Sequence, residues 1–281
     1  MKKFCIAAVI LLLVLMLISA LIALSEKSPL KDKVALIRIE GPIFDSKEAI
    51  EELKKYAKES SVKAIVLRVD SPGGAVAPSQ EIYEEVKKAA ASKPVVASMG
   101  SVAASGGYYI VSPATRVVAN PGTITGSIGV IMEIPNIEGL MDKIGVKTEV
   151  IKSGRHKDMA TMFRTMGKEE RELLQGVLDD VHSQFINAVS EGRKLPVETV
   201  RELADGRIFT GRQAAELKLV DELGNIEDAI ALAARLAGIK GEPEVVSKEK
   251  KFTVIDLLLG KLPGQFTEVI PSMKVKYMMT P

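Results

Sequence analysis

Residues 95–109 join a short apolar strand to a run of small residues that ends in a glycine pair. Ser105 stands directly before that pair, Gly106 and Gly107. Small side chains allow the backbone to turn sharply and to pack closely against a neighbouring strand, and glycine adopts dihedral angles that other residues resist. The pattern therefore predicts a strand-to-helix turn from which the Ser105 hydroxyl can project. A tight turn that serves packing alone has the same pattern.

Short strands alternate with helices in the predicted organisation of the chain. Apolar runs at 34–39, 64–69 and 94–98 predict strands, and the segments 46–59 and 79–91 predict helices. The run at 64–69 is mostly apolar, which is typical of a parallel strand that is buried on both faces. This alternation predicts a layered α/β sheet with right-handed crossovers.

The second half of the chain is predicted to be richer in helix. We expect a long helix from Lys168 to about Glu191. The other elements expected here are a helix at 105–112, strands at 117–119 and 146–151, a glycine-rich bend at 121–129 and short helices at 197–203, 211–217 and 224–236. The sequence from Lys240 onward opens with charged residues and carries an apolar segment at 254–259.

Composition excludes several kinds of function. The 281 residues, 47% of them apolar, suffice for one large α/β domain or two small ones with a sizeable core. The net charge is only +2, so no strong field is available to attract nucleic acid. The single cysteine, Cys5, lies in the apolar N-terminus, which leaves the folded part without a disulfide or a thiol nucleophile. His156 and His182 are the only histidines, which narrows the choice of a catalytic base.

The N-terminus carries an uncharged apolar run at residues 4–24, behind Lys2 and Lys3. As a helix, this run would just span a bilayer. The lysines favour a cytoplasmic N-terminus, which places the chain after Ser25 on the outer face of the membrane. A cleaved signal peptide is the alternative, but its apolar stretch would normally be shorter and end at an Ala-x-Ala-like site. We therefore expect a single-pass anchor in the cell (inner) membrane that contacts lipid through residues 4–24.

These patterns divide the chain into four parts. Residues 1–25 form the cytoplasmic N-terminus and the transmembrane anchor, and residues 26–33 form a polar stalk. The α/β domain is expected at 34–240. The tail at 241–281 is expected to be partly flexible, or to dock on another subunit or in a peptide-binding groove.

Three polar stretches could complete a site around a nucleophilic serine, which needs a base and donors for the oxyanion. In Asp-Ser-Pro-Gly-Gly, Gly73 and Gly74 leave backbone N–H groups unobstructed at the end of a strand, where α/β sheets bind ligands. Lys157 is a candidate base, provided that burial or a nearby positive charge keeps its amine neutral. Ser127 could accept a hydrogen bond from that amine. Each stretch alone is also compatible with an ordinary turn or a solvated surface.

The order of five motifs is more specific than any one of them. They are Asp-Ser-Pro-Gly-Gly, Ala-Ser-Gly-Gly-Tyr-Tyr, Thr-Gly-Ser-Ile-Gly, Lys-Ser-Gly-x-x-Lys-Asp and Ala-Asp-Gly-Arg-x-Phe-Thr-Gly-Arg-Gln-Ala. Over residues 34–238 the chain resembles the signal peptide peptidase A family in its half-length form. This family consists of membrane-anchored serine proteases with a Ser-Lys dyad and a layered Clp-protease and crotonase-like α/β fold.

The resemblance implies a role for each site residue. Ser105 matches the nucleophile, Lys157 matches the general base, and Ser127 matches the serine that orients the lysine. The N–H groups of Gly73 or Gly74 and of Gly106 match those of the family's oxyanion hole. The motif that begins at Asp205 is a family signature to which we assign a structural role.

The resemblance also implies a mechanism and partners. Lys157 would take the proton from Ser105, the hydroxyl would attack a peptide carbonyl, and water would complete the acyl-transfer cycle. No cofactor is expected. The family's substrates are residual signal peptides and other apolar peptides in or near the membrane. Family members form ring-like homo-oligomers in which neighbouring subunits complete the binding grooves and, in some cases, the catalytic residues.

Three alternatives remain open from the sequence. The same fold could use His156 or His182 as the base of a Ser-His protease, with an aspartate behind it. The chain could also be a membrane scaffold of the same fold without catalysis. Binding of coenzyme A thioesters, as in crotonase-like proteins, is disfavoured because a domain outside the cytoplasm would not meet coenzyme A.

Overall fold

The computed structural model describes residue 16, residues 32–248 and residues 276–278. The anchor predicted at 4–24 lies outside the described residues, apart from Met16, and so does the apolar segment predicted at 254–259. Within the described residues, no helix combines the length and the apolar character that crossing a membrane requires.

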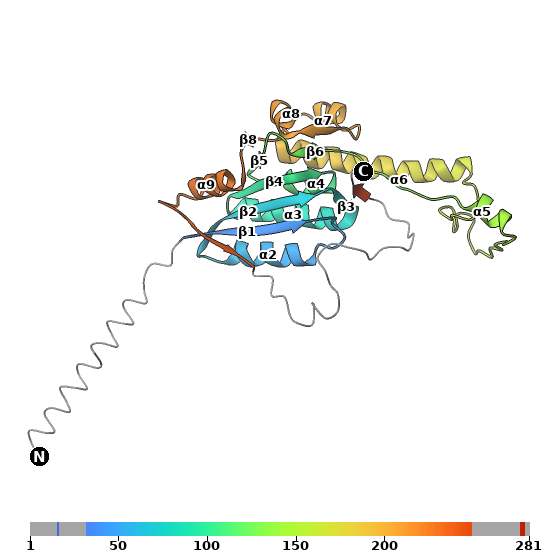
Figure 1. The fold of residues 1–281 in the computed structure, drawn as a ribbon, viewed down its shortest axis with the longest axis horizontal. Helices are drawn as coiled ribbons and strands as arrows, with labels where there is room; N and C mark the ends of the chain where they lie inside the picture. Colours follow the sequence, from blue (N-terminus) through green and yellow to red (C-terminus); the bar gives the residue numbers. More distant parts are fainter. Residues whose placement is uncertain (1–15, 17–31, 249–275, 279–281) are drawn as a thin grey trace, which may run out of the picture.

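An open, mostly parallel sheet forms the centre of the fold (Figure 1). Its main path runs β7-β6-β4-β2-β1-β9, and β5 pairs with β4 and β8. The strands are β1 Lys33–Glu40, β2 Val62–Ser71, β4 Val95–Ala104, β5 Arg116–Ala119, β6 Ile124–Gly126, β7 Ile208–Thr210, β8 Glu222–Leu223 and β9 Glu244–Ser247. Among the described strands of this sheet, only the short β6–β7 pair is antiparallel. The predicted mixed α/β architecture is confirmed.

Helices cover both faces of this sheet. On β1, Ala35 and Ile37 face a core that also contains residues of α2 and α3, whereas Val34 and Leu36 face a second core built with α9. This alternation follows from the two-residue period of a strand. The helices are α2 Lys47–Lys58, α3 Val76–Ser92, α4 Gly106–Val111, α6 Lys168–Arg193, α7 Val197–Leu203, α8 Gly211–Glu216 and α9 Ile226–Leu236. The prediction that the run at 64–69 is a strand buried on both faces is confirmed.

β4 is longer than the sequence pattern indicates. We expected a strand at 94–98, and it continues to Ala104. Its first half pairs with β5 and its second half with β6. In this second half Gly100 packs against β2, where a Cβ would lie 2.7 Å from Asp70 Cγ, so a larger residue would not fit. The extension carries Ser105 to the end of the sheet.

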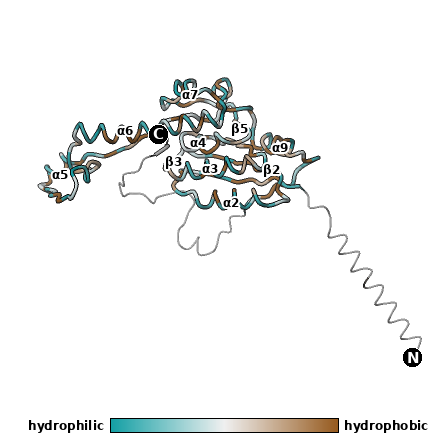
Figure 2. The backbone as a smooth tube through the Cα atoms, turned by 180° about the vertical axis from the view of Figure 1, so that it is seen from behind, coloured by the Kyte–Doolittle hydropathy of each residue, from teal (hydrophilic) through white to brown (hydrophobic). Residues whose placement is uncertain are grey.

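Residues 135–167, which we call the arm, extend away from the sheet at the outer end of α6 (Figure 1). The arm contains α5, Glu138–Lys143, which the sequence pattern did not predict. The strand predicted at 146–151 is wrong, since this segment is irregular and Ile151 is 97% exposed. A strand needs a neighbour for its backbone N–H and C=O groups, and no described strand of the chain pairs with this segment. Figure 2 shows hydrophobic residues in this exposed part of the chain.

A short tail strand lies beside β3, Gly73–Ala75. This strand, β10 (Lys276–Met278), pairs with β3 in antiparallel orientation. The pairing sets Tyr277 opposite Gly74. A segment near the C-terminus therefore lies along the glycine pair that the sequence analysis assigned to the oxyanion hole.

Candidate active site

Ser105 lies in a strained turn between β4 and α4. Its φ is 54° and its ψ is −120°, a conformation that costs a non-glycine residue about 1–3 kcal/mol. Its N–H donates to the carbonyl of Gly126 and its carbonyl accepts from the N–H of Tyr109, both at 2.8 Å. The residue is 1% exposed, and no hydrogen bond to its hydroxyl is found among the described residues. A strained strand-to-helix turn also holds the nucleophilic serine of α/β-hydrolases at the end of their sheet.

The glycines around Ser105 are required by close backbone contacts. A Cβ on Gly107 would lie 2.6 Å from the carbonyl oxygen of Ser71, and a Cβ on Gly74 would overlap with the backbone of Ile43. The start of α4 therefore packs directly on the end of β2. This contact brings the Gly73-Gly74 pair to the Ser105 turn.

Gly107→Ala is expected to lower the free energy of unfolding by about 1–3 kcal/mol, because the added methyl group overpacks this contact. Gly176→Ala is the matched control, since Gly176 lies within α6 with open space around its Cα. This control is expected to leave stability unchanged or to raise it by up to about 1 kcal/mol. Urea unfolding of both variants measures the difference, and equal effects would contradict the close packing.

Ser127 lies next to Ser105, at the end of the neighbouring strand. Ala104 pairs with Gly126 across β4 and β6, and the Ser127 N–H donates to the carbonyl of Arg207 at 2.8 Å. Ser127 has a φ of 49°. Two of the four non-glycine residues with positive φ in the described part of the chain are thus these two serines. Such strain concentrates at functional sites.

The carbonyl of Arg207 explains part of the signature motif that begins at Asp205. Asp205 accepts hydrogen bonds from the backbone and the guanidinium of Arg207, and β7 then pairs with β6. This loop holds Ser127 in its strained conformation. The motif was present in the sequence, but its contact with Ser127 depends on strand pairing between residues far apart and was not predicted.

Gly74 presents its backbone groups at the edge of β3 along which β10 lies. The carbonyl of Gly73 and the N–H of Ala75 bond to Ile43, at 2.9 and 2.7 Å. Because these groups alternate in direction along a strand, those of Gly74 point to the opposite edge, where β10 lies. The Gly73 N–H instead donates to Ser71 Oγ at 3.1 Å.

Gly106 opens α4, and the first N–H groups of a helix have no acceptor within it. These groups lie beside Ser105. The structure thus places Ser105, Ser127, Gly73, Gly74 and Gly106 close together. An extended peptide added along the β3 edge would meet backbone donors and a serine hydroxyl in one place.

Lys157 lies in the arm, far from Ser105 of the same chain. Its neighbour His156 is 3.7 Å from Glu169 at the start of α6, whereas Phe185 of the same helix packs 4.9 Å from the ring of Tyr109. The 16 residues between the two α6 positions span about 24 Å, and Ser105 is one helical turn, about 6 Å, from Tyr109. Within one chain the structure does not bring Lys157, which is exposed, to Ser105.

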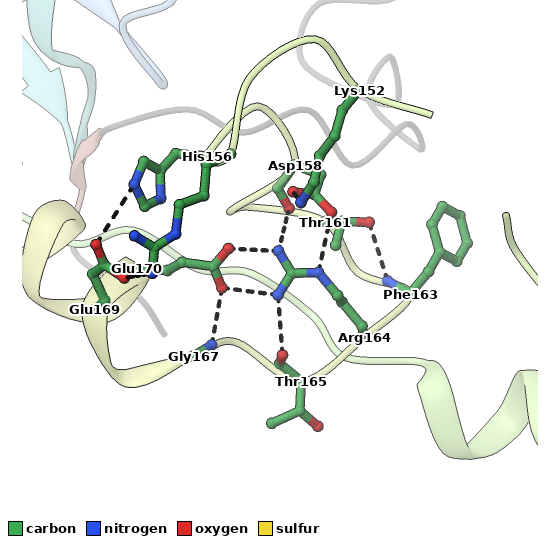
Figure 3. A network of polar contacts seen from close by, with 11 residues as sticks. Lys152, His156, Asp158, Thr161, Phe163, Arg164, Thr165, Gly167, Glu169 and Glu170 are labelled. Carbon is green, nitrogen blue, oxygen red and sulfur yellow. Dashed lines mark hydrogen bonds and ion pairs between the residues drawn. The ribbon is translucent and has the colours of Figure 1, made fainter. Parts of the chain in front are cut away.

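A polar network in the arm includes Asp158, the residue that follows Lys157 in the sequence (Figure 3). Asp158 pairs with Arg164 and Lys152, and Arg164 also pairs with Glu170. Hydrogen bonds from Arg164, and then from Lys152, hold the pKa of Asp158 well below its usual value. Arg164, followed by the Gly167 N–H, lowers the pKa of Glu170 to about 2. Both carboxylates are therefore charged at neutral pH.

His182 shares a pocket with Ser127. This pocket of about 810 Å³ lies between α6, the segment after β6 and the loop around Arg207. Nε2 of His182 is buried and has no hydrogen-bond partner among the described residues. His156, the other candidate histidine, lies in the arm next to Lys157. In the described part of the chain, no group of three or more His, Cys, Asp or Glu side chains is arranged to hold a metal ion.

Two family models match this chain. The model described as Peptidase family S49 matches residues 87–240, which include Ser105, Ser127 and Lys157. The chain belongs to peptidase family S49. A model described as Clp protease matches residues 30–123, in agreement with the open α/β sheet.

Individual relatives of this S49 peptidase carry related names. A protein of Synechocystis sp. with a provisional protease name is 47% identical over 76% of this chain and 77% of its own length. Protease 4 of Salmonella typhi is 36% identical over 85% of this chain and 40% of its own. The chloroplastic serine protease SPPA of Arabidopsis thaliana is 33% identical over 81% of this chain and 35% of its own. The resemblance to the signal peptide peptidase A family is confirmed, and with it the class of serine-type peptidase.

Proposed function

We propose that this S49 peptidase is a membrane-anchored endopeptidase that hydrolyses residual signal peptides and other apolar peptides through a Ser-Lys dyad. The observation that carries the proposal is the strained, buried turn at Ser105, with Ser127 on one side and the Gly74 edge on the other. The apolar run at 4–24 would hold the catalytic domain at the outer face of the membrane, where such peptides remain.

In this mechanism the neutral amine of Lys157 removes the proton from Ser105 Oγ, which attacks the peptide carbonyl. The N–H groups of Gly74 and Gly106 stabilise the oxyanion. The protonated amine then donates to the leaving nitrogen, and water hydrolyses the acyl-enzyme with the same lysine as base. Ser127 Oγ accepts a hydrogen bond from the amine and orients it.

The position of β10 supports binding of an extended peptide along β3. Residues 276–278 occupy the edge at which Gly74 presents its N–H and C=O groups. A substrate strand in the same place would gain main-chain hydrogen bonds whatever its sequence, and side-chain pockets would supply selectivity. Substrate and tail would then compete for one edge.

The position of Lys157 leads to a dyad that is shared between two subunits. Because Lys157 of one chain lies far from its own Ser105, we propose that it meets Ser105 of a neighbour in a ring-like homo-oligomer. The arm supports this arrangement, since Leu140, Ile144 and Val146 expose large apolar side chains that an adjacent copy would cover. A repeated head-to-tail contact of this kind closes into a ring.

Covalent labelling of Ser105 tests the peptidase assignment against a non-catalytic scaffold. A serine-reactive phosphonate is expected to add one label per active subunit, at Ser105, because that hydroxyl is activated by a base. Ser105→Ala is expected to abolish labelling, whereas Ser101→Ala, at an exposed position of β4, is expected to retain it. Absence of labelling in the folded wild-type oligomer would favour the scaffold.

A further inference from the structure

Arg164 joins Asp158 and Glu170, the two carboxylates of the polar network in the arm (Figure 3). Arg164 Nε donates to Oδ2 of Asp158 at 3.1 Å, and Nη2 donates to the carbonyl oxygen of Asp158 at 3.4 Å. Nη1 donates to Oε2 of Glu170 at 2.8 Å and to the carbonyl oxygen of Thr165 at 3.3 Å. The guanidinium thus connects the residue directly after Lys157 to the first turn of α6.

The burial of this network distinguishes it from an ordinary surface ion pair. The side chains of Asp158 and Glu170 are 12% and 11% exposed, and that of Arg164 is 34% exposed. In the same segment, Arg155 pairs with Glu169, but these side chains are 76% and 52% exposed. Exposed ion pairs contribute little to stability. A partly buried guanidinium that donates to several acceptors holds those acceptors in one relative position.

The backbone around Lys157 is held by these contacts. Glu170 also accepts the Gly167 N–H at 2.9 Å, which fixes the start of α6. The Lys157 N–H donates to Gly154 O at 3.2 Å in the turns that precede Asp158. Arg164 therefore ties the backbone at Asp158, the residue after Lys157, to the start of α6.

We propose that Arg164 is a positioning residue of this peptidase, which fixes the arm backbone so that Lys157 presents its amine to the nucleophile in one geometry. The proposal rests on the proposed function, since it takes Lys157 as the base. Arg164 itself does not touch the substrate or the reacting atoms. Only a guanidinium supplies the planar set of donors that joins two carboxylates and two carbonyl groups here.

Steady-state kinetics of Arg164→Ala in the full-length oligomer tests the proposal. A misplaced base is expected to lower kcat about 100-fold while KM changes no more than about twofold. Millimolar guanidinium ion, which can occupy the vacated site, is expected to restore part of kcat. Arg155→Ala is the matched control and is expected to keep kcat within about twofold, since its ion pair is exposed.

Arg164→Lys keeps the positive charge and is a second test in case the alanine variant fails to fold. Its single ammonium group cannot reproduce the fork, so kcat is expected to fall at least about tenfold. Full kcat in a folded Arg164→Lys oligomer would overturn the proposal. So would an Arg164→Ala variant that matches Arg155→Ala, or one whose loss of kcat equals its loss of folded oligomer in thermal melts and size-exclusion chromatography.

Failure of this inference differs from failure of the proposed function. In one outcome, Lys157→Ala is inactive and is partly rescued by a small alkylamine, while Arg164→Ala and Arg164→Lys are fully active. Lys157 then remains the base and Arg164 has no positioning role. If Lys157→Ala retains activity, the base is a different group and both proposals fail.

Discussion

Lys157→Ala is expected to reduce peptide hydrolysis by about 10⁴-fold or more, because a serine hydroxyl is a weak nucleophile without its base. His156→Ala and His182→Ala are expected to retain most of the activity. His156 is a close control, since it lies in the same arm and its contact with Glu169 is a single exposed pair. Hydrolysis of an apolar fluorogenic peptide by the detergent-solubilised oligomer measures all three variants.

The opposite pattern would identify a Ser-His protease. His182 is the more serious competitor, because it shares a pocket with Ser127 within one chain. An inactive but folded His182→Ala oligomer, together with an active Lys157→Ala oligomer, would refute the Ser-Lys dyad. The phosphonate label separates these cases from misfolding, since any variant with a working base should still react at Ser105.

The central sheet and the Ser105 turn could be predicted because their signals are local. The apolar run at 64–69 indicates a strand that is buried on both faces, and Ser105-Gly106-Gly107 indicates a sharp turn. In both places the residues that form the element are adjacent in the sequence. β1, α2, α3 and α6 were predicted within a few residues for the same reason.

The arm could not be predicted from local pattern. Val146, Val150 and Ile151 have the composition of a strand, yet their side chains are exposed in the single chain. Apolar composition indicates that a segment is to be buried, but it does not indicate which surface buries it. β9 was missed for the opposite reason. It begins in a charged stretch and becomes a strand only because the edge of β1 is open beside it.

The site was likewise predicted in part. Ser105, Ser127 and the glycines lie close together because they are at the ends of neighbouring strands. The carboxyl ends of parallel strands meet at one edge of a sheet, so this proximity can be predicted once the strands are recognised in the sequence. The distance between Ser105 and Lys157 depends on the direction in which α6 projects the arm. No motif encodes that direction, so the separation within one chain was not predicted.

A dyad that is shared between two subunits leads to a quantitative prediction for the activity of mixed oligomers. Ser105→Ala subunits keep Lys157, and Lys157→Ala subunits keep Ser105, so each variant alone is expected to be inactive. When the two are co-assembled in equal amounts, a site is complete only where an intact serine faces an intact lysine of its neighbour. Random assembly therefore restores about a quarter of the wild-type activity per site.

A second mixture calibrates the first. Wild-type subunits co-assembled with equal amounts of the Ser105→Ala/Lys157→Ala double variant should also give about a quarter of full activity if each dyad spans two subunits, and about half if it lies within one.

Activity of the co-assembled Ser105→Ala and Lys157→Ala subunits is thus the most direct measurement of a dyad formed between neighbours. We predict about a quarter of the wild-type rate, against a background close to zero for either variant alone. A mixture that stays at this background, while wild-type and double-variant subunits demonstrably co-assemble, would contradict the shared dyad.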